Sequence, residues 1–194
     1  MLQHVSDDHI KPHTVTLDRE IKEDALTLIP LCDVHFPFLV KWNQDREVIR
    51  WVETDPSKEL TEEEIKSIYI TASKDSLCFL IVYQNQPIGE CWLQPMNITK
   101  VINRHPGTAV GRIDLMIGEN DFQNAGIGTM VVEMLTEYAS DSKMYEVLYG
   151  FMRADNMRSR SVFRKNGYKL QTKGYVLKNE DEKQFSYCCY SKKL

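Results

Sequence analysis

The feature that most constrains this chain is the segment Gln123 to Gly128, which lies between a predicted strand and a predicted helix. Residues 110–117 are mostly apolar and are typical of a largely buried strand. After the segment, apolar side chains return every three or four positions, at Ile127, Met130, Val131, Met134, Leu135 and Tyr138. This is the period of a helix with one buried face. The two glycines, Gly126 and Gly128, let backbone approach a ligand closely, and the helix start offers free N–H groups and a positive dipole end. The arrangement favours binding of an anion such as a pyrophosphate, although an ordinary turn before a helix has the same composition.

A second strand and helix follow along the chain. Residues 146–152 form a compact apolar run, which predicts a strand. The next helix is predicted to begin behind Asn156, a common N-cap residue, and to end at Gly167, which readily adopts the left-handed conformation. Arg164 and Lys165 suit the negative end of its dipole.

Together these two segments resemble the two coenzyme-binding signatures of the GNAT superfamily of N-acetyltransferases. The first signature is Gln-x-x-Gly-x-Gly, at Gln123 to Gly128. The second is carried by Asn156, Ser159, Phe163, Lys165, Gly167 and Tyr168. The resemblance covers about residues 26–192. It implies an α/β fold with a central mixed, mostly antiparallel sheet of about six to seven strands and helices on both faces.

The amino-terminal half resembles one subgroup more closely, the aminoglycoside 6'-N-acetyltransferases. The similarity is carried by a predicted helix at 38–43 that ends in Trp42-Asn43, by Val48 to Trp51, by a capping box at Thr61 and by Gly111 to Asp114. In that subgroup the segment after the first helix covers the acceptor. The resemblance therefore implies a small, cationic amine as the substrate, acetylated at the 6'-amino group of an aminoglycoside.

The resemblance also implies acetyl-CoA as the acetyl donor and assigns its binding residues. Backbone groups of Leu115, Met116 and Ile117 would face the thioester and the pantetheine arm, because the corresponding strand of the family diverges from its neighbour. Asn156 would bond the same arm, alone or together with its N-cap role. The pyrophosphate would lie on the loop, at Gln123, Asn124, Ala125, Gly126, Ile127, Gly128 and Thr129. No metal ion is expected to take part.

Asp114 is the candidate catalytic residue. Acetyl transfer needs a neutral amine, whose free pKa is roughly 10. An acid within an apolar strand beside the thioester can hold the ammonium group and accept its proton. The alternative is an aspartate that serves an internal arginine or a turn. Phe163 occupies a position where many family members have a tyrosine that protonates the leaving thiolate. Its ring has no proton to give, so the thiolate leaves unassisted, or water or a tyrosine such as Tyr149, Tyr168 or Tyr175 supplies the proton.

Other residues are predicted to contact the acceptor beside Asp114. Trp51 packs against a sugar ring or, as is common for tryptophan, against the core. Glu53 and Asp55 follow it and either attract the amine or remain solvated loop acids. Glu90, in a predicted strand, is a second acid unless alternation points it to solvent. Residues 151–152 are Phe and Met where aminoglycoside enzymes often have an acid, so one contact to a cationic acceptor is missing there.

Length and charge fit one soluble domain over residues 1–194, with 1–25 as an N-terminal extension. The extension is expected to add a strand at 14–17, before a charged turn at 18–24. A net charge of −4 without a basic tract argues against nucleic acid and anionic membranes as partners. The acidity suits a polycationic acceptor, or simply aids solubility. No apolar run approaches the roughly 20 residues of a membrane span, and the start lacks the pattern of a signal peptide. We therefore expect a cytoplasmic monomer or homodimer.

The sequence also predicts the state of the cysteines and several short structural elements. The five cysteines, an odd number without a Cys-x-x-Cys pair, predict reduced and mostly buried thiols. A short helix is expected at 45–52, a hairpin turn at 84–89, an insertion loop at 94–108 and a final hairpin turn at 176–184.

The sequence leaves other functions open. Related folds acetylate polyamines, siderophore precursors or protein N-termini. A non-catalytic acyl-CoA-binding module is the alternative from another class. Phe163 makes it conceivable and Asp114 argues against it, because a pure binding module has no need of an acid facing the thioester.

Overall fold

The computed structural model describes residues 8–21, 24–51, 59–178 and 184–194, and at its centre is one eight-stranded sheet. The strands are β1 (Leu17–Ile21), β2 (Asp24–Pro30), β3 (Leu77–Tyr83), β4 (Gln86–Pro95), β5 (Val110–Ile117), β6 (Val147–Arg153), β7 (Lys169–Lys178) and β8 (Gln184–Lys193). Their order in the sheet is β1-β2-β3-β4-β5-β6-β8-β7. Neighbouring strands are antiparallel except for β5 and β6, which are parallel. The predicted mixed, mostly antiparallel sheet is confirmed, and it has eight strands where about six to seven were expected.

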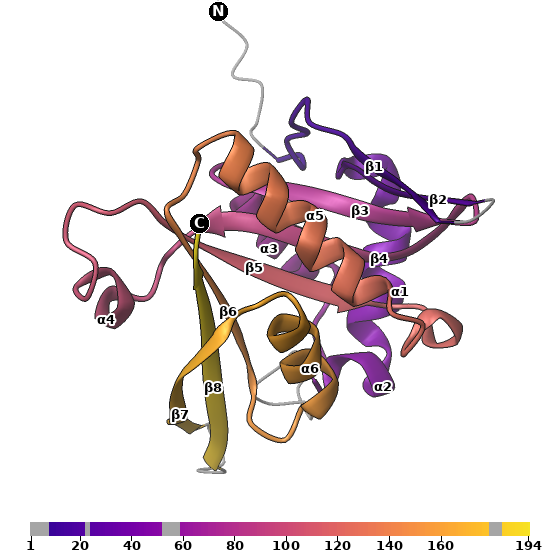
Figure 1. The fold of residues 1–194 in the computed structure, drawn as a ribbon. Helices are drawn as coiled ribbons and strands as arrows, with labels where there is room; N and C mark the ends of the chain where they lie inside the picture. The colour runs from indigo at the N-terminus through magenta and orange to yellow at the C-terminus, as the bar shows by residue number, and fades with distance from the viewer. Residues whose placement is uncertain (1–7, 22–23, 52–58, 179–183) are drawn as a thin grey trace, which may run out of the picture.

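Helices cover both faces of this sheet, as predicted. The α-helices of the described residues are α1 (Phe36–Gln44), α2 (Arg46–Ile49), α3 (Glu62–Ala72), α4 (Thr99–Ile102), α5 (Ile127–Asp141) and α6 (Met157–Lys165). Short 3-10 turns occur at Asp33–His35 and Asn120–Phe122. Figure 1 shows α5 lying across one face of the sheet, with α1 and α3 behind the other.

The local signals in the sequence define the helix ends. The Thr61 hydroxyl accepts the N–H of Glu64, and the Glu64 side chain accepts the N–H of Thr61 at 2.9 Å, so the predicted capping box opens α3. Oδ1 of Asn156 accepts the N–H of Ser159 at 3.0 Å and caps α6. Gly167 follows α6 with φ +79°, in the left-handed region predicted for it.

The strands β5 and β6 separate after a short stretch of pairing. Residues 110–112 pair in parallel with residues 147–149, and the pairing stops there. Beyond that point β5 continues to Ile117 and β6 to Arg153 without pairing to each other. Each strand then leads into a helix, α5 and α6 respectively. The divergence that the family resemblance implied is therefore present.

The two faces of the sheet carry separate hydrophobic cores. Under α5, buried side chains such as Leu135 and Phe163 pack together, and the other face buries Trp42 and Leu80 beneath α1 and α3. Gly150 of β6 lies directly below Phe163, where an added Cβ would come within 2.2 Å of the ring. Because such a contact is impossible without movement, Gly150 is what allows Phe163 to pack against the sheet.

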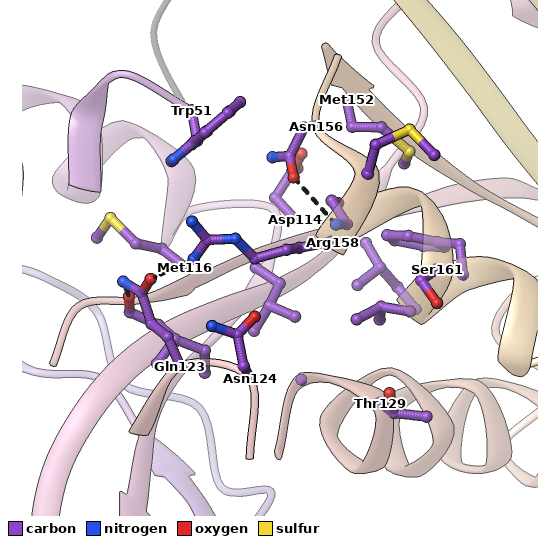
Figure 2. A pocket seen from close by; sticks show the side chains of 18 of the residues that line it. Trp51, Asp114, Met116, Gln123, Asn124, Thr129, Met152, Asn156, Arg158 and Ser161 are labelled. Carbon is purple, nitrogen blue, oxygen red and sulfur yellow. Dashed lines mark hydrogen bonds between the residues drawn. The ribbon is translucent and has the colours of Figure 1, made fainter. Parts of the chain in front are cut away.

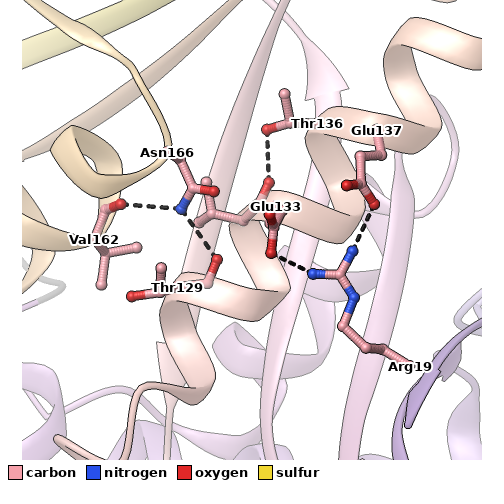
Figure 3. A network of polar contacts seen from close by, with 8 residues as sticks. Arg19, Thr129, Glu133, Thr136, Glu137, Val162 and Asn166 are labelled. Atoms are coloured by element: carbon pink, nitrogen blue, oxygen red, sulfur yellow. Dashed lines mark hydrogen bonds and ion pairs between the residues drawn. The ribbon is translucent and has the colours of Figure 1, made fainter. Parts of the chain in front are cut away.

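Two sets of polar contacts hold α5 in place (Figure 3). Arg19 of β1 forms ion pairs with Glu133 and, at 2.6 Å, with Glu137 on the exposed side of α5. Asn166, just after α6, donates to the carbonyl of Thr129 in α5 at 3.0 Å and also to its own helix. The first set attaches the amino-terminal strand to α5. The second fixes the start of α5 relative to α6.

The structure corrects the predicted amino-terminal extension. The added strand is β1 at 17–21, not 14–17, and most of the predicted turn at 18–24 belongs to β1 or opens β2. The charged side chains suggested a turn, but β1 is an edge strand of the sheet. Asp18 and Glu20 are exposed, whereas Arg19 between them is half-buried and forms an ion pair with α5.

Other boundaries move by a few residues. Within the range 45–52 the described helix is α2 at 46–49. The predicted loop at 94–108 begins later, because β4 runs through Pro95, and it contains α4. The final strands extend into the predicted turn at 176–184, since β7 continues to Lys178 and β8 begins at Gln184.

None of the five cysteines forms a disulfide; four are buried and Cys32 is half-buried, in line with the expected thiols. Among the described residues, no helix combines the length and the apolar character that crossing a bilayer requires.

Candidate active site

A cavity of about 540 Å³ lies where β5 and β6 separate. Its walls come from β5, the loop after it, the starts of α5 and α6, and the end of β6 (Figure 2). The volume is typical of a small-molecule site. The predicted site residues that line it are Trp51, Asp114, Leu115, Met116, Ile117, Gln123, Asn124, Gly126, Gly128, Thr129 and Asn156.

The remaining predicted residues lie elsewhere. Ala125 is exposed on the loop, outside the cavity lining. The Ile127 side chain is 2% exposed and belongs to the core beneath α5, so a coenzyme can reach its backbone but not its side chain. Glu90 is buried and does not line the cavity. Glu53 and Asp55 lie outside the described residues.

The loop geometry requires glycine at positions 126 and 128 for two different reasons. Gly126 has φ +85°, and an added Cβ would meet no atom within 4 Å, so its backbone conformation requires glycine. At Gly128 an added Cβ would lie 3.2 Å from Cδ2 of Leu115, so this glycine allows α5 to start close to β5. No side chain caps α5. Its first N–H groups are therefore open to an anion in the cavity.

Asn156 lies at the start of α6, on another wall of the cavity (Figure 2). Its Oδ1 caps the helix, while its amide nitrogen has no hydrogen-bond partner among the described residues. The helix-capping role and a bond to a ligand in the cavity are thus compatible.

Asp114 lines the cavity and is also held by an arginine. Nη2 and Nε of Arg112 donate to its two carboxylate oxygens at 2.7 and 2.9 Å, and Nε2 of Gln94 donates to Oδ2. Arg112 further donates to Asn97 at 2.9 Å and lies 5.7 Å from the ring centre of Phe151. Asp114 thus serves an internal arginine, as the alternative interpretation predicted, and its side chain, 30% exposed, also lines the cavity.

Glu90 lies behind this wall, on the face of the sheet that α3 covers. It pairs with Met116 across β4 and β5 and is 8% exposed, so the alternative that it points to solvent is wrong. Burial and the nearby negative charge of Asp114 raise the pKa of Glu90 to about 8, against the opposing effect of Trp92 and Tyr69 beside it. At neutral pH Glu90 is therefore largely protonated.

Two of the three tyrosines considered as proton donors, Tyr149 and Tyr168, bond other side chains away from the cavity. Tyr168 is 2% exposed and its hydroxyl bonds that of Thr136 at 2.8 Å, and burial raises its pKa to about 12. Tyr149 bonds His105 at 2.8 Å and does not line the cavity. The side chain of Tyr175 lies outside the described ones. Among the described lining residues, the one phenol is Tyr187 of β8.

Trp51 stands at the mouth of the cavity among arginines. The guanidinium groups of Arg50, Arg158 and Arg153 lie 5.1, 5.8 and 5.9 Å from its ring centres. Such stacking is favourable when the cation lies within about 6 Å of the ring. Two of these arginines also form ion pairs, Arg50 with Glu47 at 3.0 Å and Arg153 with Asp155 at 2.8 Å, so the positive charge around Trp51 is partly compensated.

Sequence reasoning missed the partner of Asp114 and two residues that line the cavity. Arg112 could have been found, because residues two apart on a strand share a face and Asp114 was already singled out. Arg158 and Tyr187 line the cavity from α6 and β8. No local pattern marks them, since their position depends on how distant elements meet.

A family profile described as an acetyltransferase (GNAT) domain matches residues 25–169. Solved structures with the same arrangement agree with it. An acetyltransferase of the GNAT family from Bacillus anthracis is 12% identical, with a TM-score of 0.74 over 92% of this chain and 98% of its own.

Two further structures carry more specific descriptions. A ribosomal protein α-N-acetyltransferase in complex with coenzyme A is 17% identical, with a TM-score of 0.72 over 91% of this chain and 98% of its own. An aminoglycoside acetyltransferase in complex with coenzyme A is 15% identical, with a TM-score of 0.62 over 92% of this chain and 95% of its own. At sequence identities this low, the two comparisons establish a shared fold and do not identify the substrate.

Proposed function

This chain belongs to the GNAT acetyltransferase family and is an acyl-CoA-dependent N-acetyltransferase, and on that premise we propose that it transfers acetyl from acetyl-CoA directly to a primary amine bound beside Asp114. The observation that carries the proposal is the cavity between β5 and β6, where an uncapped helix start and a carboxylate face one space. The helix start suits the pyrophosphate of the coenzyme, and the carboxylate suits the amine.

The reaction follows from these parts. The acceptor binds as an ammonium ion, and Asp114 takes its proton directly or through water. The neutral nitrogen attacks the thioester carbon, and backbone N–H groups of β5 on the side facing the gap stabilise the oxyanion. The carbon–sulfur bond then breaks, the cationic nitrogen of the intermediate gives up its second proton to solvent, and coenzyme A leaves as a thiolate that takes up a proton. Phe163 supplies none, so water or the phenol of Tyr187 is the source.

We expect Gly126→Val to raise the dissociation constant for acetyl-CoA at least about tenfold, which corresponds to about 1.4 kcal/mol. The side chain would project toward the bound pyrophosphate, and a β-branched residue at φ +85° strains the loop. Calorimetric titration of the folded variant with acetyl-CoA measures the effect.

Gly107→Val is the matched control for this variant. Gly107 has φ +74°, and an added Cβ there also meets no atom within 4 Å, but the residue lies away from the cavity. The two variants should lose similar stability, and coenzyme affinity should fall in Gly126→Val alone. Equal affinities in both variants would contradict the assignment of the loop to the pyrophosphate.

An aminoglycoside amino group is the first candidate acceptor. It is supported by the resemblance of the amino-terminal half, by the position of Asp114 in the cavity and by the net charge of −4. An aminoglycoside carries several ammonium groups, so its binding should weaken as salt increases.

A protein or peptide N-terminus is the second candidate, and one observation favours it. Arg112 compensates the charge of Asp114, and Arg158, whose hydrogen-bond partner is a neutral amide, adds a positive charge beside Trp51. Such a site attracts a polycation less than it attracts a single amine with polar or acidic neighbours.

One assay separates these candidates. The purified protein is incubated with acetyl-CoA and kanamycin, tobramycin, spermidine or peptides with free N-termini, and thiol release is followed. In parallel, cells expressing the chain are tested for kanamycin resistance. Acetylation of an antibiotic together with resistance supports the first candidate. Efficient acetylation of a peptide without resistance overturns it in favour of the second, and absence of transfer to any amine would contradict the proposed reaction.

A further inference from the structure

Arg158 crosses the cavity from α6 toward the loop (Figure 2). Its Nη1 donates to Oε1 of Gln123 at 2.7 Å. The amide nitrogen of Gln123 is itself held, by the carbonyl of Ile117 at 3.1 Å and by Oδ1 of Asn120 at 3.0 Å. Gln123 therefore presents its oxygen to Arg158, and the guanidinium is held beside the loop before any ligand arrives.

The loop itself carries no cation. Residues 123–129 contain neither lysine nor arginine, and the cations that line the cavity among the described residues are Arg158 and Lys165. Seven residues of helix, about 10 Å, separate these two along α6. Within the described part of the chain Arg158 forms no ion pair, and its hydrogen-bond partner is a neutral amide. Its charge is thus uncompensated next to the uncapped start of α5.

We propose that Arg158 binds the pyrophosphate of the coenzyme from α6, opposite the N–H groups of α5, and that this contact makes the enzyme select phosphorylated coenzyme over acetyl-pantetheine. The inference rests on the proposed function. Two N–H groups of a guanidinium can bond two phosphate oxygens, and such charge-assisted bonds are stronger than the bond to the Gln123 amide. The pyrophosphate therefore replaces Gln123 as the partner of Arg158.

Trp51 gives the same arginine a second role. The guanidinium lies 5.8 Å from the Trp51 ring centre, so one side chain touches both the coenzyme loop and the segment predicted to cover the acceptor. Trp51 thereby acts as a positioning residue for Arg158. Its loss should weaken coenzyme binding even though Trp51 makes no direct phosphate contact.

The test compares Arg158→Ala with Arg164→Ala, which removes an exposed arginine from the last turn of the same helix. Kinetics are measured with acetyl-CoA, with its 3'-dephospho form and with S-acetylpantetheine, which has no phosphate. For Arg158→Ala, kcat/KM should fall at least about tenfold with acetyl-CoA. It should fall equally with the dephospho form and remain unchanged with S-acetylpantetheine. Arg164→Ala should behave as wild type, and Arg158→Lys should recover part of the loss.

The other outcomes can be told apart. An equal loss with S-acetylpantetheine would overturn the proposal, because the effect would then not depend on phosphate. A loss that vanishes with the dephospho form would assign Arg158 to the 3'-phosphate instead and overturn the pyrophosphate assignment. If wild type binds acetyl-CoA and Arg158→Ala binds it equally well, the role of Arg158 fails while the proposed function stands. If wild type itself does not bind acetyl-CoA, the proposed function fails first.

Discussion

Asp114→Asn is expected to bind acetyl-CoA normally and to acetylate its acceptor at least about 100-fold more slowly than wild type, the lower end for loss of a general base. The amide keeps the shape of the side chain but neither holds an ammonium group by charge nor accepts its proton. Coenzyme binding is spared, because the loop lies at a different wall of the cavity. Steady-state rates with saturating acetyl-CoA, together with calorimetric titration of the coenzyme, measure both effects.

Arg112→Gln is the control that separates chemistry from structure at this position. It removes the cation that bonds both carboxylate oxygens of Asp114 and leaves the carboxylate in the cavity. If the carboxylate handles the amine, Arg112→Gln should retain far more activity than Asp114→Asn. Equal losses in the two variants would mean that Asp114 serves the ion pair, and the acid–base role would be wrong.

The second large effect concerns stability and pH at Glu90. In the folded state its pKa is raised to about 8 from a usual value of 4.5. Between these values the folded protein keeps a proton that the unfolded chain has released, so stability falls as pH rises through this window and levels off above it. A tenfold change in an acid dissociation constant corresponds to about 1.4 kcal/mol, so the lost stability should amount to a few kcal/mol. Glu90→Gln, which does not titrate, should be free of this loss.

Urea unfolding between pH 5 and pH 9 checks this expectation. The difference in unfolding free energy between wild type and Glu90→Gln should change steadily with pH in favour of the variant. Taking the difference cancels the titration of groups far from Glu90 that both proteins share. The groups that face the carboxyl are Asp114, Cys78 and Tyr69, and burial and the charge of Glu90 raise the pKa of Cys78 and of Tyr69, so these two thiol and phenol groups stay protonated over this pH range. Glu20→Gln, on the exposed side of β1, should follow wild type. Parallel pH profiles for wild type and Glu90→Gln would show that the carboxyl is not perturbed.

The elements around the coenzyme could be predicted because their signals are local. The apolar period fixes α5, and the cap at Asn156 and the left-handed Gly167 fix the ends of α6. The strand β1 was misplaced because its position depends on pairing with β2 and on the contact between Arg19 and α5, which the composition of the segment does not reveal. Composition alone made that strand look like a charged turn.

The candidate site likewise contains residues that local sequence patterns predict and residues that they do not. Backbone positions of the loop follow from the Gly spacing, whereas Arg158 reaches the loop only after α6 is docked beside it. The orientation of Glu90 was left open because alternation on a strand defines two faces without saying which one a helix covers. Packing of Tyr69 from α3 on that face decides it.

The separation of β5 and β6 has a consequence for how much protein a cell keeps folded. Three residue pairs join these strands, so β1–β5 on one side and β6–β8 on the other share little of the hydrogen-bond ladder. A coenzyme lying in the gap would bridge the two parts, and a ligand that binds only the folded state stabilises it by mass action. At a free concentration about 100 times its dissociation constant the gain is about 2.7 kcal/mol. The pool of coenzyme available to the protein would then act as a folding ligand, and depletion of that pool would lower the amount of this protein as well as of its substrate.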